Sequence, residues 1–291
     1  MKNRLFTGSG VALITPFKKD LSVDFEALGA LIEAQIAGGA DALITCGTTG
    51  EPSTLSADEW DAVVSFTVRQ TRRRVPVIAG TGGNNTSDVL LKARRAFELG
   101  ADGQLCVTPY YNKTSQNGLV AHFNTVADDG SLPVIMYNVP GRTGLSMSLA
   151  AAKKLSLNPR IVGIKEATGD AAFALDLIAE CGGDLPLYSG ADELTCQLRV
   201  IGGVGCSSVL SNAVPESAAT IAKADLETAA REQTRLIKFV RCLFKEVNPI
   251  PIKAAMNFMG LCENVLRLPL VPMSRENAEI LKAEMRRVGL I

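Results

Sequence analysis

Eight short apolar runs recur along the first 210 residues, and amphipathic helical patterns separate them. Such runs are typical of strands buried on both faces of a parallel sheet. They lie at residues 11–14, 42–45, 75–79, 104–107, 134–137, 161–164, 185–188 and 206–209. Alternation of strands and helices predicts an α/β protein, and eight repeats in this length predict a closed (β/α)8 TIM barrel.

The structural alternative is a doubly wound open sheet. That fold favours a glycine-rich phosphate loop after the first strand, whereas residues 15–17 here are Thr-Pro-Phe. After about residue 225 the pattern becomes purely helical, with long amphipathic stretches at 226–245 and 274–288. We therefore expect a catalytic barrel at residues 1–225 and a C-terminal helical appendage at residues 226–291.

Charge and composition narrow the class of protein. Lys and Arg together number 30, as do Asp and Glu, so the net charge is zero and neither nucleic acid nor an anionic membrane is an expected partner. No signal-peptide or membrane-spanning pattern is seen, and the seven cysteines are dispersed, which favours a cytoplasmic protein with reduced thiols. With His122 as the single histidine, a His-rich metal site is excluded, and we expect no metal or cofactor.

One lysine, Lys165, falls at the C-terminal end of the sixth run. Active sites of such barrels lie at the C-terminal ends of the strands. Burial there lowers the pKa of an amine, and an uncharged lysine is a nucleophile that forms a Schiff base with a carbonyl carbon. Gly163 lies on the same face of the strand and would leave room for the lysine stem. The alternative is an ordinary rim lysine paired with Glu166.

Other strand ends carry groups that such a lysine needs. Thr48, Thr49, Tyr111 and Tyr137 could form a chain of hydroxyls that moves protons. Their alternative role is packing at the barrel rim and capping of helices. Arg142 follows a Pro-Gly turn and suits bidentate capture of a carboxylate, or is a plain surface charge.

Four motifs at strand ends together resemble those of a known family. They are Gly-Thr-Thr-Gly-Glu at 47–51, Thr-Pro-Tyr-Tyr-Asn at 108–112, Tyr-Asn-Val-Pro-Gly-Arg-Thr-Gly at 137–144 and Gly-Ile-Lys-Glu-Ala-Thr-Gly at 163–169. The chain resembles the pyruvate-dependent class I aldolases, which include N-acetylneuraminate lyase, and within them the dihydrodipicolinate synthases. The resemblance runs from about Gly8 to the C-terminal helices.

The resemblance implies four catalytic residues. Lys165 would form an imine with pyruvate, and Tyr137 would donate and accept protons beside it. Thr48 and Tyr111 would relay protons, with Tyr111 reaching into the site of a neighbouring subunit. The expected assembly is a homo-oligomer, a tetramer built as a dimer of dimers.

The resemblance also implies the residues that bind substrates. Thr49 would hold the carboxylate of pyruvate, Arg142 the carboxylate of aspartate semialdehyde, and Gly190 would line the pocket. Ser207 stands where members usually carry an aliphatic residue, and its contact is expected to run through the backbone.

The implied reaction is that of a lyase. Pyruvate condenses with L-aspartate 4-semialdehyde to give 4-hydroxy-tetrahydrodipicolinate, a step of lysine and diaminopimelate synthesis. Two alternatives stay open: an aldolase or lyase acting on a 2-keto sugar acid, and a non-catalytic ligand-binding barrel.

Feedback by lysine is expected to be weak or absent. Aligned with lysine-sensitive members, the effector site at the dimer interface would hold Ala57, Trp60 and Asp88 in place of its usual polar contacts, although Asn84 and Tyr110 match. Trp60 is expected to fill volume that the effector needs.

Overall fold

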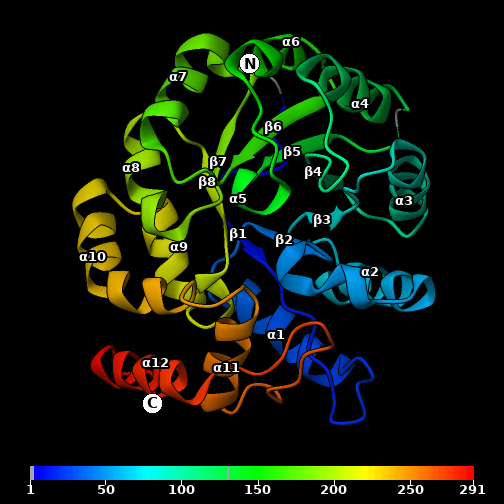
Figure 1. Ribbon diagram of the computed structural model, residues 1–291. Helices are drawn as coiled ribbons and strands as arrows, with labels where there is room; N and C mark the ends of the chain where they lie inside the picture. Colours follow the sequence, from blue (N-terminus) through cyan, green and yellow to red (C-terminus); the bar gives the residue numbers. More distant parts are fainter. Residues whose placement is uncertain (1–2, 130) are drawn as a thin grey trace.

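The chain folds into a closed barrel of eight parallel strands with helices around it (Figure 1). The computed structural model describes residues 3–129 and 131–291. Each strand pairs with its neighbours in chain order, and the eighth pairs with the first, so the (β/α)8 expectation is confirmed. The strands are β1 (Gly8–Ala12), β2 (Ala42–Thr45), β3 (Val77–Gly80), β4 (Gly103–Val107), β5 (Val134–Asn138), β6 (Ile161–Glu166), β7 (Leu187–Ser189) and β8 (Gly205–Ser208).

Helices cover the outside of the barrel because parallel strands need long crossover connections. Those between and after the strands are α1 (Phe25–Ala37), α2 (Ala57–Thr71), α3 (Thr86–Glu98), α4 (Gln116–Asp128), α6 (Leu149–Ser156), α7 (Ala171–Cys181), α8 (Thr195–Val200) and α9 (Pro215–Lys223). A one-turn helix, α5 (Pro140–Thr143), follows β5 at the mouth of the barrel. Asp24, Ser56 and Ser148 each cap the first turn of their helix with a side-chain oxygen.

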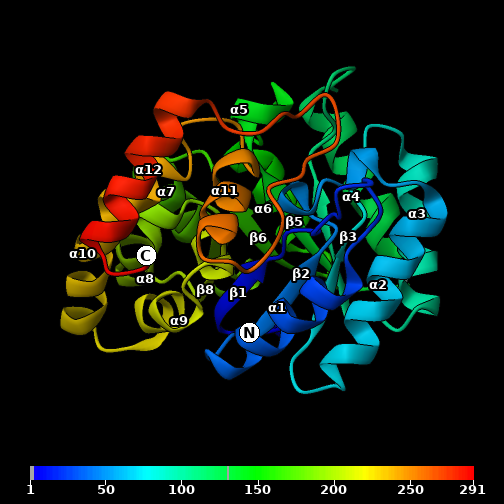
Figure 2. The same cartoon turned by 90° about the horizontal axis from the view of Figure 1, so that it is seen from below.

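Three C-terminal helices pack on one side of the barrel (Figure 2). They are α10 (Leu226–Cys242), α11 (Ile250–Phe258) and α12 (Arg275–Arg287). Phe239 of α10 and Met256 of α11 share one hydrophobic cluster with Leu28 of α1 and Val64 of α2. The proposed boundary at residue 225 therefore separates two parts that share a core, and it stays a prediction. No helix in the described part of the chain is long and apolar enough to cross a membrane.

The first strand differs most from its predicted position, since it begins at Gly8 rather than Val11 and ends before Leu13. Glycines at 8 and 10 concealed it, because a rule based on β-branched residues does not recognise a glycine-rich strand. The glycines serve close packing inside the barrel. A Cβ on Gly10 would lie 2.8 Å from the Phe6 ring and 2.9 Å from the carbonyl oxygen of Cys206.

Aromatic side chains fill part of the barrel interior. Phe6 stacks on Tyr188 of β7 with ring centroids 4.5 Å apart, and the Tyr188 hydroxyl donates a hydrogen bond of 2.8 Å to the Phe6 carbonyl. Ile44, Ile78 and Ile135 belong to the same interior cluster. Packing of this kind fills the barrel below the strand ends, where Lys165 lies.

Candidate active site

A cavity of about 350 Å³ opens at the C-terminal ends of the strands. Six residues predicted from the sequence line it together: Thr48, Thr49, Tyr137, Arg142, Lys165 and Gly190. Helix α10 adds Val240 and Arg241 to its wall, and the segment between α10 and α11 adds Phe244 and Asn248. The C-terminal region therefore forms part of the candidate site, which the sequence did not indicate.

Lys165 lies in β6 opposite Tyr137 of β5 and points into this cavity. Its Nζ atom donates a hydrogen bond of 3.0 Å to the Ser207 hydroxyl and sits 4.4 Å from the centre of the Tyr137 ring. The residue is only 5% exposed. Burial lowers the pKa of Lys165 from 10.5 to about 8, although the charge of Asp192 opposes the shift. About one molecule in ten then carries a neutral amine at pH 7.

The rim-lysine alternative required a pair between Lys165 and Glu166, and the structure does not contain one. Successive side chains of a strand point to opposite faces, so Glu166 faces away from the cavity. Its carboxylate accepts hydrogen bonds from the Asn138 amide, at 2.8 Å, and from the backbone N–H of Thr168. Within the described chain, Lys165 is in no ion pair, and its amine is free to react once deprotonated.

The glycine that makes room for Lys165 is Gly190, and the expectation for Gly163 was wrong. A Cβ on Gly163 would meet the ring of Tyr188 at 2.8 Å, because that ring fills the space beside it. A Cβ on Gly190 would come within 3.0 Å of Cγ and Cε of Lys165. The lysine stem therefore passes over the β7 end, and no larger residue fits there without displacing it.

Tyr137 places a protonated phenol beside the amine. Burial raises the pKa of Tyr137, while the charge of Arg142 and a hydrogen bond with the Thr48 side chain partly offset that rise. Thr48 stands at the start of a 3-10 turn, Thr48–Gly50, directly after β2. At neutral pH the phenol keeps its proton, so this pair of hydroxyls can deliver and recover a proton next to Lys165.

Asn248 connects two residues expected to bind carboxylates. Its side-chain amide donates a hydrogen bond of 2.9 Å to the Thr49 hydroxyl, and its backbone carbonyl accepts one of 3.1 Å from the Arg142 guanidinium. Because the Thr49 oxygen accepts from Asn248, the hydroxyl hydrogen of Thr49 is left to donate elsewhere. Sequence reasoning missed Asn248, since it follows no strand and lies more than 100 residues after Arg142.

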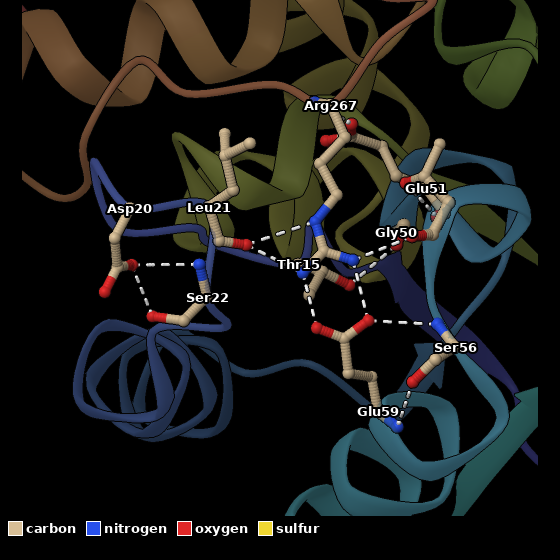
Figure 3. A network of polar contacts seen from close by, with 10 residues as sticks. Thr15, Asp20, Leu21, Ser22, Gly50, Glu51, Ser56, Glu59 and Arg267 are labelled. Atoms are coloured by element: carbon tan, nitrogen blue, oxygen red, sulfur yellow. Dashed lines mark hydrogen bonds and ion pairs between the residues drawn. The ribbon is translucent and has the colours of Figure 1, made fainter.

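Charged groups anchor the loop that carries Thr48 and Thr49 (Figure 3). The Thr15 hydroxyl donates a 2.7 Å hydrogen bond to the Gly50 carbonyl. The next residue, Glu51, forms a fully buried ion pair with Lys253 of α11. The guanidinium of Arg267 donates 2.7 Å hydrogen bonds to the Glu59 carboxylate and the Thr54 carbonyl. The C-terminal region thus fixes both ends of the segment from Glu51 to Glu59.

Ser207 is buried beside Lys165, whereas Tyr111 is exposed outside the cavity. The Ser207 side chain is 5% exposed and contacts Lys165 directly, and the expected contact of its backbone with substrate stays a prediction. Tyr111 is 89% exposed and does not line the cavity. Its backbone adopts a positive φ of 66°, which is uncommon for a tyrosine. A role for Tyr111 in catalysis therefore stays a prediction that requires a second subunit.

A second cleft, of about 290 Å³, lies beside Tyr110. Trp60 does not line this cleft, because α2 turns Trp60 into the core with Val63 and Val64. Ala57 and Asp88 are exposed and also lie outside the lining of this cleft. The expected effector site lies at a dimer interface, so weak or absent inhibition by lysine stays a prediction.

Histidine and cysteine have structural roles in the described residues. His122 lies in α4, and its Nδ1 is 2.9 Å from the Thr86 hydroxyl, as expected of a satisfied helix histidine. Burial raises the pKa of the Cys46 and Cys206 thiols to about 12, so neither is a thiolate at neutral pH. Across residues 3–129 and 131–291, no group of three His, Cys, Asp or Glu side chains could hold a metal ion.

A buried lysine of lowered pKa at a strand end, with a phenol, a threonine hydroxyl and a guanidinium around it, is typical of Schiff-base-forming (β/α)8 barrels. The chain belongs to the dihydrodipicolinate synthetase family, whose model matches residues 5–287. It is 46% identical to the 4-hydroxy-tetrahydrodipicolinate synthase of Geobacter sulfurreducens, over 99% of this chain and all of the relative.

Solved structures agree with this family assignment. The dihydrodipicolinate synthase of Thermotoga maritima superposes with a TM-score of 0.96 at 38% identity, covering 99% of this chain and all of that one. A monomeric dihydrodipicolinate synthase variant also superposes with a TM-score of 0.96 at 39% identity, covering 99% of this chain and 98% of the variant.

Proposed function

We propose that this chain is a lyase that condenses pyruvate with L-aspartate 4-semialdehyde to give 4-hydroxy-tetrahydrodipicolinate, in lysine and diaminopimelate synthesis. The observation that carries the proposal is the buried amine of Lys165, which donates to Ser207, has a lowered pKa and faces Tyr137. Family membership at 46% identity with a synthase over the full length supports the choice of substrates.

The chemistry follows from the amine. Neutral Lys165 attacks the keto carbon of pyruvate, and loss of water gives a protonated imine. The imine makes the pyruvate methyl group acidic, so a proton leaves to give an enamine, which attacks the aldehyde carbon of the second substrate. The amino group of that substrate then attacks the imine carbon, which closes the ring and releases Lys165. The imine itself is the electron sink, so the proposal needs no metal or cofactor.

The side chains around Lys165 have matching tasks in this scheme. Tyr137, hydrogen-bonded with Thr48, moves protons during loss of water and formation of the enamine. Thr49 donates its hydroxyl hydrogen to the pyruvate carboxylate. That hydrogen is free to do so because the Thr49 oxygen accepts its hydrogen bond from the Asn248 amide. Arg142, held at the mouth by the Asn248 carbonyl, binds the carboxylate of aspartate semialdehyde.

Arg142→Ala tests the choice of the second substrate. A lost charge-assisted hydrogen bond is worth about 1.5–3 kcal/mol, so KM for aspartate semialdehyde should rise roughly ten- to a hundred-fold and KM for pyruvate much less. Arg241→Ala is the matched control, because Arg241 lines the same cavity from α10 and instead pairs with Glu193 at 3.6 Å. Equal weakening of both substrates in Arg142→Ala would favour the sugar-acid lyase alternative.

The proposed assembly is a homotetramer built from two dimers, with Tyr111 completing the site of the neighbouring subunit. Tyr111 is 89% exposed on the single chain, which supports this role. Sedimentation should give a species larger than a monomer. Mixed dimers of Tyr111→Phe and Lys165→Ala subunits should recover part of the activity, because one site per dimer is then intact. Subunit exchange without recovery would argue against a shared site.

A cytoplasmic location is part of the proposal. All seven cysteines are free thiols in the structure, and six of them are buried. Such a set is typical of a protein that lives in a reducing compartment.

A further inference from the structure

Ser207 gives the Lys165 amine a hydrogen-bond partner from a strand two places along the barrel. It lies in β8, opposite Gly10 of β1, and is 5% exposed. Its Oγ accepts a hydrogen bond of 3.0 Å from Nζ of Lys165. Among the described residues, no other group accepts a hydrogen bond from this amine. The contact crosses from β8 to β6, over the short strand β7 that lies between them.

A hydroxyl in this place has two physical effects on the amine. An acceptor stabilises the ammonium form more than the neutral form, because the charged N–H donates the stronger hydrogen bond. It also occupies one N–H of the neutral amine, which restricts the direction of the nitrogen lone pair. A hydrocarbon side chain at the same position would do neither.

We propose that Ser207 is a positioning residue for Lys165: its hydroxyl holds the amine in one orientation and sets the pH at which that amine becomes reactive. The proposal rests on the proposed function only in taking Lys165 as the nucleophile that meets pyruvate.

Other groups that act on the same amine stay in place when Ser207 is changed. Tyr137 of β5 contacts it through the ring face, and Arg142 of α5 adds a positive charge from the mouth. Asp192, after β7, adds a negative charge and is itself held by the backbone N–H groups of Val209 and Leu210. Cys206 of β8 is a neutral thiol, since burial raises its pKa to about 12.

Three variants separate the hydroxyl from the volume of the side chain. Ser207→Ala removes the hydroxyl, but the space left can admit a water molecule. Ser207→Val removes it and fills that space. Ser207→Thr keeps the hydroxyl in nearly the same shape as valine and is the rescue control. Each variant is first checked for a folded far-UV circular dichroism spectrum, and the pair of Ala and Thr suffices if the valine variant does not fold.

The measurement is the initial rate of covalent trapping by pyruvate and borohydride as a function of pH, read by intact-protein mass spectrometry. Removing an acceptor from the ammonium lowers the pKa of the amine, so the midpoint of the profile should fall in Ser207→Val and Ser207→Ala. The expected shift is about one pH unit, or a tenfold change in the protonation equilibrium. The rate at the high-pH plateau should also fall, because the lone pair loses its fixed direction.

Ser207→Thr should keep the wild-type midpoint. The proposal is overturned if the midpoint of Ser207→Val equals that of the wild type, or if threonine shifts it as far as valine does. In either case a trapped adduct would still form, so the proposed function would not be contradicted. Wild-type protein that forms no adduct at any pH would overturn both.

Discussion

Lys165→Ala should lose turnover by a factor on the order of 10⁴ or more, while the barrel stays folded. The substitution removes the only atom that can bond covalently to pyruvate in the proposed scheme. Lys165 forms no ion pair in the described chain, and burial lowers the pKa of its amine to about 8. Removing that amine should therefore leave the fold intact. Steady-state assays with pyruvate and aspartate semialdehyde measure the loss.

Lys154→Ala is the matched control for that experiment. Lys154 lies on α6 with an exposed side chain, and its removal should leave turnover unchanged. In the wild type, kcat/KM for pyruvate should rise as pH increases toward about 8, because the neutral amine attacks. Substantial turnover by Lys165→Ala, or a rate that falls across this range, would be incompatible with the scheme.

Tyr137→Phe should lower kcat about 10²- to 10⁴-fold, the usual contribution of one general acid–base group. The phenyl ring remains, so the packing against Nζ of Lys165, now 4.4 Å from the ring centre, is kept. The loss therefore reports on the hydroxyl, which hydrogen-bonds with Thr48. The assay is the same steady-state measurement, with the rate of borohydride trapping as a second readout.

Tyr188→Phe serves as the control for the loss of a buried tyrosine hydroxyl. Its hydroxyl donates to the Phe6 carbonyl away from the cavity, so its removal should cost about 1–3 kcal/mol of stability and little activity. A Tyr137→Phe enzyme with near wild-type kcat would remove Tyr137 from the proton-transfer chain.

Strand ends were the part of the site that the sequence could predict. In a closed parallel barrel all eight C-terminal ends meet at one mouth, so motifs far apart in the chain must converge. The structure brings three such residues to one cavity: Thr48, which follows β2, Tyr137 of β5 and Lys165 of β6. The position of a residue at a strand end predicts that its side chain starts at the barrel mouth. It does not predict which residue that side chain contacts.

Contacts made across the barrel could not be predicted in this way. Asn248 and Lys253 come from the helical region, where no strand-end rule applies, yet they hold Thr49 and Glu51. The partner of Lys165 proved to be Ser207 of β8, because both side chains point inward and meet over β7, the strand between them. Trp60 makes another core contact that the strand-end rule does not predict: its helical spacing with Val63 and Val64 points it into the core.

Trapping of the imine tests the central claim most directly. Wild-type protein is incubated with pyruvate and borohydride, digested, and mapped by peptide mass spectrometry. The proposed function predicts one reduced pyruvate adduct, on the peptide that contains Lys165, and no adduct in Lys165→Ala. Absence of any adduct in the wild type, or an adduct on Lys153 or Lys154 instead, would contradict it.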